Sequence, residues 1–280
     1  MGLVGAMLKD LAVTNYRPED SRWKSHRDKA LAIFDSEASC TLDFATRLAA
    51  ADAIGQGHDP RLDGDNWIRI KGGKFCLGAQ RTDPKNPNFE PEYGKEPSPV
   101  QRKTVKTFEI AKYPVTVREY ESFLSANYGR EKPRKWREQL RYPNRPVVGV
   151  SWHDASAYAD SKGCRLITEA QWEYVAKNGS AGTKYPWGNE PPDGKRANSV
   201  GHLTPVGLYP EGATSTGVHD MVGNVTQWTA DSPNGGVERW LRGSAYGDPR
   251  GFLHVSFRFS TEPNHLSSFV GFRLARDVPS

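Results

Sequence analysis

Residues 238–277, ERWLRGSAYGDPRGFLHVSFRFSTEPNHLSSFVGFRLARD, form the stretch around which the rest of the chain is organised. Its ends, RWLRGS and VGFRLARD, are typical of rigid elements, whereas the middle indicates neither a helix nor a regular strand. The middle is rich in Phe, His, Ser, Gly and Tyr and contains no Lys. Such a mixture is typical of an adaptable binding surface, because aromatic rings supply contact area at low entropic cost. The alternative is that Phe252, Phe257, Phe259 and Phe269 are ordinary core residues.

The composition bounds the class of protein. At 280 residues, the chain is long enough for one large domain, or for one domain with a small appendage. Its 25% charged and 36% hydrophobic residues are typical of a soluble globular protein. The 27 glycines and 20 prolines favour a loop-rich fold over a helical bundle, because both residue types interrupt helices.

The charge pattern excludes an evident nucleic-acid site. The net charge is +5, and the densest basic patch, residues 130–141, is interrupted by Pro133 and Glu138. Nucleic-acid binding needs a basic stripe on one face, so we expect no nucleic-acid partner.

The cysteines and the N-terminal sequence indicate in which cellular compartment the protein is expected. Three cysteines lie far apart in sequence and form no CxxC pair, which favours free thiols in a reducing compartment. No apolar run is long enough to cross a bilayer. The start, MGLVGAM, lacks the basic residues of a signal peptide, and Ala6 breaks the myristoylation pattern. We therefore expect a cytoplasmic protein without a membrane partner.

The first 62 residues are predicted to form a helical N-terminal segment. Asp20 or Ser21 can cap a first helix, and Thr41 can cap a second. Glycines at positions 55 and 57 are expected to end the second helix.

Residues 63–280 are predicted to form a separate domain of mixed α and β structure. Gly72-Gly73 joins two short apolar runs and predicts a β-hairpin. Beyond Gly179 only short strands and loops are expected. The predicted helix N-caps in this domain are Thr116 (with Glu119 completing a capping box), Asp154 and Thr168.

Six sequence blocks carry a family resemblance: RPVVGVSWHDASAYADSKGCRLITEAQWEYVAKNG, YPWGN, ANSV, DMVGNVTQW, RWLRGS and VGFRLARD. In order and spacing they resemble the formylglycine-generating (sulfatase-modifying factor) family, over about residues 67–277. The resemblance implies an α+β, loop-rich variant of the C-type lectin fold, preceded here by the short helical segment. Because fold does not imply function, each site is considered separately.

The catalytic signature of the resembling family is absent. Its enzymes share two cysteines, five residues apart, whose thiolates bind copper. Counting back from the VGFR block, the matching positions are Arg250 and Val255. Neither residue can ligate Cu(I), so we expect a protein that is not an enzyme.

A calcium site is the one cofactor site that the resemblance suggests; no cofactor is otherwise required. The family binds calcium around a GNxWEW motif, and carboxylate and amide oxygens suit this ion. The alternative is that the loop hydrogen-bonds to itself without metal. The matching positions here are Asp220, Gly223, Val225 and Gln227.

The two motifs that flank the C-terminal segment, Arg-Gly-Ser at 242–244 and Gly-Phe-Arg at 271–273, also resemble those of variable proteins of diversity-generating retroelements. Adenine-directed mutagenesis in those proteins produces codons that never encode Lys, Glu, Gln, Met or Trp. Between Ser244 and Phe269, only Glu262 departs from this restriction. The resemblance therefore implies a variable binding region at about residues 240–269, carried on a conserved framework.

We therefore expect a diversified face that binds an unknown protein or a small ligand. An alternative is a formylglycine-generating oxidase acting on a protein cysteine; another is an accessory sensor domain of a signalling or defence assembly. The predicted anchors are Tyr246, Phe252, Phe257, Phe259 and Phe269, and the predicted polar contacts are Asp248, His254, His265 and Ser267. The remaining predicted binding residues are Trp240, Ala245, Gly247, Gly251, Thr261 and Ser268.

Overall fold

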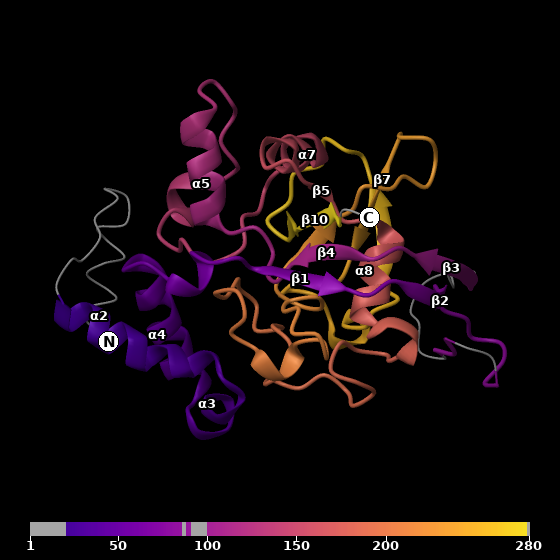
Figure 1. Ribbon diagram of the computed structural model, residues 1–280, viewed down its shortest axis with the longest axis horizontal. Helices are drawn as coiled ribbons and strands as arrows, with labels where there is room; N and C mark the ends of the chain where they lie inside the picture. The colour runs from indigo at the N-terminus through magenta and orange to yellow at the C-terminus, as the bar shows by residue number, and fades with distance from the viewer. Residues whose placement is uncertain (1–20, 86–87, 91–99, 279–280) are drawn as a thin grey trace.

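The computed structural model describes residues 21–85, 88–90 and 100–278. Within these ranges, two four-stranded sheets and one two-stranded sheet form the body, and helices α2 to α4 lie to one side of it (Figure 1). The strand orders are β1-β4-β10-β5, β8-β7-β6-β9 and β2-β3. The strands are β1 Trp67–Ile70, β2 Gly73–Leu77, β3 Gln101–Val105, β4 Phe108–Ala111, β5 Arg165–Leu166, β6 Thr226–Trp228, β7 Arg239–Arg242, β8 Arg258–Thr261, β9 Val270–Phe272 and β10 Leu274–Asp277.

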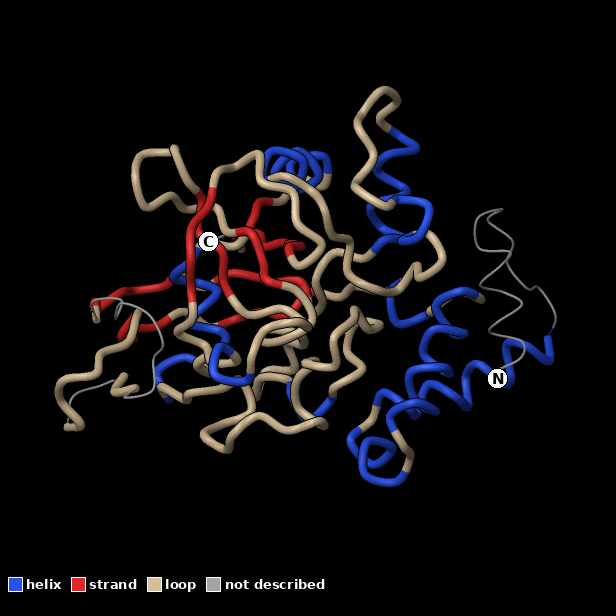
Figure 2. The backbone as a smooth tube through the Cα atoms, turned by 180° about the vertical axis from the view of Figure 1, so that it is seen from behind, coloured by secondary structure: helices blue, strands red, loops and turns tan. Residues whose placement is uncertain are grey.

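The helices are short and the loops between the strands are long (Figure 2). After α8 the described chain contains only short strands, 3₁₀ turns and loops, as the sequence predicts. The α-helices are α2 Ser21–Ala30, α3 Ser36–Thr41, α4 Phe44–Gln56, α5 Val117–Ala126, α6 Trp136–Gln139, α7 Trp152–Ser161 and α8 Glu169–Ala176. The 3₁₀ turns are η2 Leu31–Phe34, η3 Pro60–Leu62, η4 Gly179–Ala181, η5 Pro210–Gly212 and η6 Arg250–Phe252.

The two ends of the C-terminal stretch enter the same sheet. Strand β7 pairs antiparallel with β6, and β9 pairs parallel with the same strand. Residues 243–269 therefore leave a sheet and return to it, which fixes both ends of the segment. The expectation of no regular strand in between was wrong, because β8 pairs with β7 over four residue pairs. Its alternation of polar Arg258 and Ser260 with Phe259 is the period-2 signal of a strand.

The hairpin predicted at Gly72-Gly73 does not form. Strand β1 pairs with β4, whereas β2 pairs with β3 in a different sheet. Gly72 instead lets the backbone pass close to Val105, because a Cβ at position 72 would lie 2.4 Å from the carbonyl oxygen of Val105. The chain therefore crosses between sheets at this glycine pair.

Two of the predicted helix caps were wrong by a few residues. Thr41 ends α3, where its hydroxyl donates to the carbonyl of Glu37, and α4 is capped by Asp43, which accepts from the amide of Thr46 at 2.9 Å. Asp154 is not the cap of α7 but the third residue of a capping box begun by Ser151. The Thr116–Glu119 box of α5 and the Thr168 cap of α8 are confirmed.

The body is centred on two buried tryptophans. Trp172 of α8 and Trp228 of β6 are fully buried in separate hydrophobic clusters, and both indole N–H groups find acceptors. Next to Trp172, Gly243 adopts a φ of 75°, and a Cβ there would lie 2.7 Å from the carbonyl oxygen of Met221. The turn after β7 therefore requires glycine.

The N-terminal helices pack on the body. Ile33, Phe34 and Ile54 share a hydrophobic cluster with Leu208 and Tyr209. An ion pair of 2.6 Å also joins α4 to the loop before α7 through Asp52 and Arg145. From residue 21 onward, the helical segment and the body therefore share an interface.

Several predictions fall on residues 1–20, which lie outside the described ranges. They are the helix cap at Asp20 and the expectation that MGLVGAM is neither a signal peptide nor a myristoylation site. Among the residues that the structure describes, no helix has the length and apolarity needed to traverse a bilayer. The cytoplasmic assignment stays a prediction.

Candidate binding face

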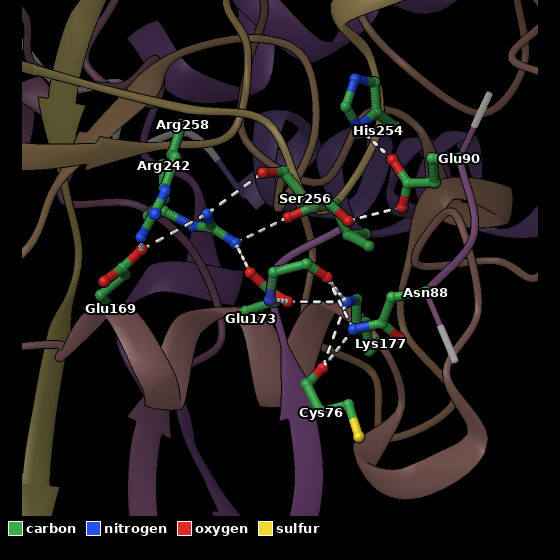
Figure 3. Close-up of polar contacts among 12 residues, drawn as sticks. Cys76, Asn88, Glu90, Glu169, Glu173, Lys177, Arg242, His254, Ser256 and Arg258 are labelled. Atoms are coloured by element: carbon green, nitrogen blue, oxygen red, sulfur yellow. Dashed lines mark hydrogen bonds and ion pairs between the residues drawn. The ribbon is translucent and has the colours of Figure 1, made fainter. Parts of the chain in front are cut away.

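A cluster of buried charges lies beneath the C-terminal segment (Figure 3). Arg242 of β7 forms an ion pair with Glu173 of α8, and Glu173 also pairs with Lys177 at 2.6 Å. All three side chains are at most 2% exposed. Burial by itself raises the pKa of Glu173, but Arg242 and Lys177 outweigh burial and hold this pKa below its usual value. Glu173 is therefore ionised at neutral pH.

This cluster holds the backbone of the C-terminal segment from the inside. The guanidinium of Arg242 donates to the carbonyl oxygens of Val255 at 2.8 Å and Ser256 at 3.3 Å. Leu253 and Val255 are fully buried in the hydrophobic cluster of Trp172. Because both the backbone and alternate side chains are anchored, residues 253–256 have a fixed inner side.

A second anchor comes from Glu90, a buried residue in the loop before β3. One carboxylate oxygen accepts from the hydroxyl of Ser256 at 2.5 Å, and the other lies 3.1 Å from Nδ1 of His254. The predicted ligand contact His254 thus faces an internal carboxylate (Figure 3). His254 therefore helps to hold the inner side of the segment and does not belong to its outer, ligand-facing surface.

Three of the predicted aromatic anchors form a row of rings. The centroids of Phe252 and Phe257 are 4.9 Å apart, and those of Phe257 and Phe259 are 6.0 Å apart. Phe257 is buried, and Phe259 packs on the hydrophobic cluster that includes Leu241. These rings therefore belong largely to the support, although Phe252 and Phe259 remain partly exposed.

The other two predicted anchors form a pair of which Phe269 is exposed and Tyr246 is partly exposed. The rings of Tyr246 and Phe269 pack at 4.9 Å, and Phe269 is 43% exposed. A Cβ on Gly247 would lie 2.8 Å from the Phe269 ring, so glycine allows this approach. Tyr246 lies four residues beyond β7 and Phe269 immediately precedes β9, so both rings stand on the ends of a sheet.

A groove of about 730 Å³ lies beside this pair. Tyr246 and Ser268 line it together with Val117, with residues 201–203 and with several residues between positions 134 and 149. Its volume is in the range of ligand-binding pockets. None of residues 252–259 is part of its described lining, and of the predicted binding residues that lining includes Tyr246 and Ser268.

Some predicted polar contacts close their own loops. Asp248 accepts from the amide of Ala245 at 2.7 Å, and Ser267 accepts from the amide of Phe269 at 3.2 Å. Ala245 is buried, so it cannot contact a ligand in this conformation. Gly247, Gly251, His265 and Ser268 are exposed, whereas Trp240 and Thr261 are partly exposed on neighbouring strands.

Two of the four residues matched to a calcium site, Asp220 and Gln227, accept hydrogen bonds from protein donors through their side-chain oxygens. Oε1 of Gln227 accepts from Trp172 at 3.1 Å and from Arg273 at 2.8 Å, and Oδ2 of Asp220 accepts from the amide of Gly207 at 2.8 Å. Burial lowers the pKa of Arg273 to about 9, which leaves it charged at neutral pH. A guanidinium at this point uses the lone pairs and repels a cation. The side-chain oxygen of Gln227 therefore does not suit a calcium ion.

The positions matched to the copper-binding thiol pair also lack ligands. Arg250 is exposed in η6, and Val255 is buried. The cysteines Cys40, Cys76 and Cys164 form no disulfide and lie in α3, in β2 and before β5. Among the described residues, no group of three His, Cys, Asp or Glu side chains is placed to hold a metal ion.

The sequence profile of the sulfatase-modifying factor enzyme 1-like domain matches residues 55–278. The chain belongs to this family. The match confirms both the family resemblance and the α+β fold. It starts within α4, so the end of the N-terminal segment is included in the family domain.

Relatives of the chain differ in activity. A formylglycine-generating enzyme from Streptomyces coelicolor is 35% identical over 169 residues, which cover 49% of this chain and 54% of that protein. An inactive Cα-formylglycine-generating enzyme 2 from Mus musculus is 29% identical, over 79% of this chain and 87% of that protein. The serine/threonine-protein kinase Pkn1 of Chlamydia trachomatis is 30% identical over 75% of this chain, which spans 38% of the kinase. Membership of the family therefore does not by itself assign an activity.

Two solved structures share the fold. PvdO from Pseudomonas aeruginosa has a TM-score of 0.62 and 27% identity, over 76% of this chain and 94% of that chain. Treponema denticola variable protein 1 has a TM-score of 0.56 and 20% identity, over 76% of this chain and 95% of that chain. The second likeness concerns the fold alone.

Sequence reasoning missed two parts of this surface. Leu266, which is 39% exposed, is not among the predicted contacts, although it follows His265 directly. The far side of the groove, residues 134–149, was also missed. Its basic composition was visible in the sequence, but nothing in the sequence places it beside Tyr246.

Proposed function

We propose that this chain is a non-catalytic binding protein that presents its C-terminal segment to a ligand. The observation that carries the proposal is the Tyr246–Phe269 pair: Phe269 is exposed and the partly exposed Tyr246 lines a groove, while the inner side of their segment is anchored. Aromatic side chains that become desolvated at the centre of an interface contribute about 2 kcal/mol or more each. An aromatic pair on a rigid support is therefore well suited to binding.

The absence of catalysis is supported by the replaced thiols and by the similarity to the inactive mouse protein. Arg250 and Val255 offer no soft ligand for copper. In the enzymes of this family, oxygen activation depends on the two thiols that these residues replace. The competing proposal is an oxidase acting on a protein cysteine. Turnover of a cysteine-containing sulfatase-type peptide by the copper-loaded chain would establish the oxidase instead.

We further propose that the face is diversified by a retroelement. Support comes from residues 244–269, where the residue types forbidden to adenine-mutated codons are absent except for Glu262. The DNA beside the gene provides the test. A downstream near-identical repeat that differs at adenines, next to a reverse transcriptase gene, is expected; its absence would remove this part of the proposal.

Ligand capture tests the binding function itself. The purified chain is used as bait against extract from its source, and each captured protein is then purified and titrated directly. The double variant Tyr246→Ser/Phe269→Ser should weaken direct binding at least tenfold. The control is Tyr128→Ser, because Tyr128 is 99% exposed but lies outside the groove. Equal binding by the two variants would contradict the proposal.

A second candidate is an accessory domain of a signalling assembly. It is favoured by the similarity to part of the chlamydial kinase, and the N-terminal helices would then dock the partner. In that case, substitutions on the exposed side of α2, such as Lys24→Glu, would abolish capture, and the Tyr246/Phe269 variant would not.

A further inference from the structure

The groove beside Tyr246 has a rigid basic edge. Gln139 ties the two sides of this edge together: its side chain donates to the carbonyls of Arg134 at 2.8 Å and Val148 at 3.0 Å, and accepts from the amide of Val148 at 3.1 Å. A Cβ on Gly149 would lie 3.3 Å from the amide nitrogen of Arg134, so the chain segments around residues 134 and 149 are in close contact. The edge is therefore preorganised.

The edge carries positive charge that the protein does not neutralise. Arg134 is exposed and has no ion pair within the described parts of the chain. Lys135 lies 3.9 Å from Glu138, but both side chains are more than 70% exposed, so the pair is weak. Residues 130–141 contain six basic and two acidic residues, which strengthens the positive potential along this edge.

Not every cation at the groove is free to bind a ligand. Arg145 forms a bidentate pair with Asp52, at 2.6 and 3.1 Å, and its guanidinium lies 3.7 Å from the ring centroid of Tyr142. Its charge is already matched by the N-terminal helices. The available cations are therefore those at Arg134 and Lys135.

The rest of the lining combines the polar residues Glu138, Gln139, His202 and Ser268 with apolar and aromatic side chains. Val117, Val148 and Leu203 supply aliphatic surface inside the groove. One ring face of Tyr142 is covered by Arg145, and Tyr246 packs on Phe269, so stacking platforms for nucleotide bases are already partly occupied. Aliphatic side chains next to carboxylates fit this lining better than a phosphate backbone with unstacked bases.

We propose that the groove binds an acidic peptide segment, whose carboxylates meet Arg134 and Lys135 while its apolar side chains enter beside Tyr246. The inference rests on the proposed binding function and adds the chemical class of the ligand. Arginine suits this role because its planar fork binds a carboxylate through two parallel hydrogen bonds. The charged edge would also speed association at low salt.

The test uses short synthetic fluorescent peptides in which glutamate alternates with leucine and tyrosine, and matched peptides with glutamine or lysine at the glutamate positions. Fluorescence anisotropy is recorded for the full chain, for Arg134→Glu and for Arg102→Glu. Arg102 is an exposed residue of β3, which lies at the opposite end of the body from α5, so it controls for net charge (Figure 1). An oligothymidylate is titrated in parallel.

The proposal expects the glutamate peptide to bind about tenfold more tightly than the glutamine peptide, with the lysine peptide weakest. Arg134→Glu should weaken the glutamate peptide at least tenfold, whereas Arg102→Glu should change it less than about twofold. Equal losses in the two variants, equal affinity for the glutamine peptide, or tighter binding of the oligothymidylate would each overturn it. If the peptide experiment gives one of these results while ligand capture still depends on Tyr246 and Phe269, the acidic-peptide proposal fails and the proposed binding function stands. The failure of one proposal can therefore be distinguished from the failure of the other.

Discussion

Replacing Glu173 with glutamine should strongly destabilise the fold, because the carboxylate is the centre of the buried charge cluster. It is fully buried, pairs with Arg242 and Lys177, and accepts from the amide of Gly78 at 2.6 Å. Glutamine keeps the size and one acceptor, but it removes the carboxylate that pairs with Lys177 and leaves Arg242 only the more distant carboxylate of Glu169, at 3.7 Å. Breaking a buried pair in this way costs about 3–5 kcal/mol. We therefore expect the free energy of unfolding to fall by that amount.

The assay is urea denaturation followed by tryptophan fluorescence, with Glu131→Gln as the control because Glu131 is exposed. The control should change the free energy of unfolding by less than about 0.5 kcal/mol. Hydrogen exchange should also accelerate in residues 253–256, because Arg242 no longer has a fixed position. A loss below about 1 kcal/mol for Glu173→Gln would refute the view that this cluster anchors the segment.

The same cluster predicts the direction of a pH effect. The pKa of Glu173 is lowered in the folded state, so the unfolded state binds more protons as the pH falls. Its contribution to stability is therefore fully present above the unfolded value of about 4.5 and is lost as the pH drops towards the folded value. Denaturation curves at several pH values should show a smaller acid loss in Glu173→Gln than in the unaltered chain; equal losses would contradict the assignment.

Two further predictions concern the metal and the strand crossing. Excess calcium or a chelator should leave the melting temperature unchanged, since Arg273 occupies the acceptors of Gln227; a clear rise with calcium would show that the ion binds. Gly72→Ala should cost about 1–3 kcal/mol in urea denaturation, because the added Cβ meets the Val105 carbonyl. The control Gly64→Ala should be nearly neutral, as no atom lies within 4 Å of a Cβ there, and equal effects would contradict the close-approach explanation.

The sequence predicted those features that depend on neighbouring residues. The capping box of α5 could be recognised because Thr116 and Glu119 are three residues apart and satisfy each other's backbone groups. The two motifs that flank the C-terminal segment were recognisable as a block pattern, and the structure places both ends beside β6. The family, and with it the α+β fold, followed from the same blocks.

Features that depend on distant pairing could not be predicted in this way. Two short apolar runs joined by Gly72-Gly73 look the same whether they pair with each other or with β4 and β3, so the hairpin was wrong. The division of the aromatic residues had the same cause. Phe257 and Phe269 are alike in sequence context, but only the contacts of the folded chain bury the first and expose the second.

The central claim is that a rigid frame carries an exchangeable surface, and one pair of libraries tests it most directly. In the first library the exposed positions His265, Ser268 and Phe269 and the partly exposed position Tyr246 are randomised; in the second, the buried positions Leu253, Val255 and Phe257. Urea midpoints are measured for folded members of each. We predict that most members of the first library keep the midpoint of the unaltered chain and that most members of the second unfold. Equal unfolding in the two libraries would contradict the claim.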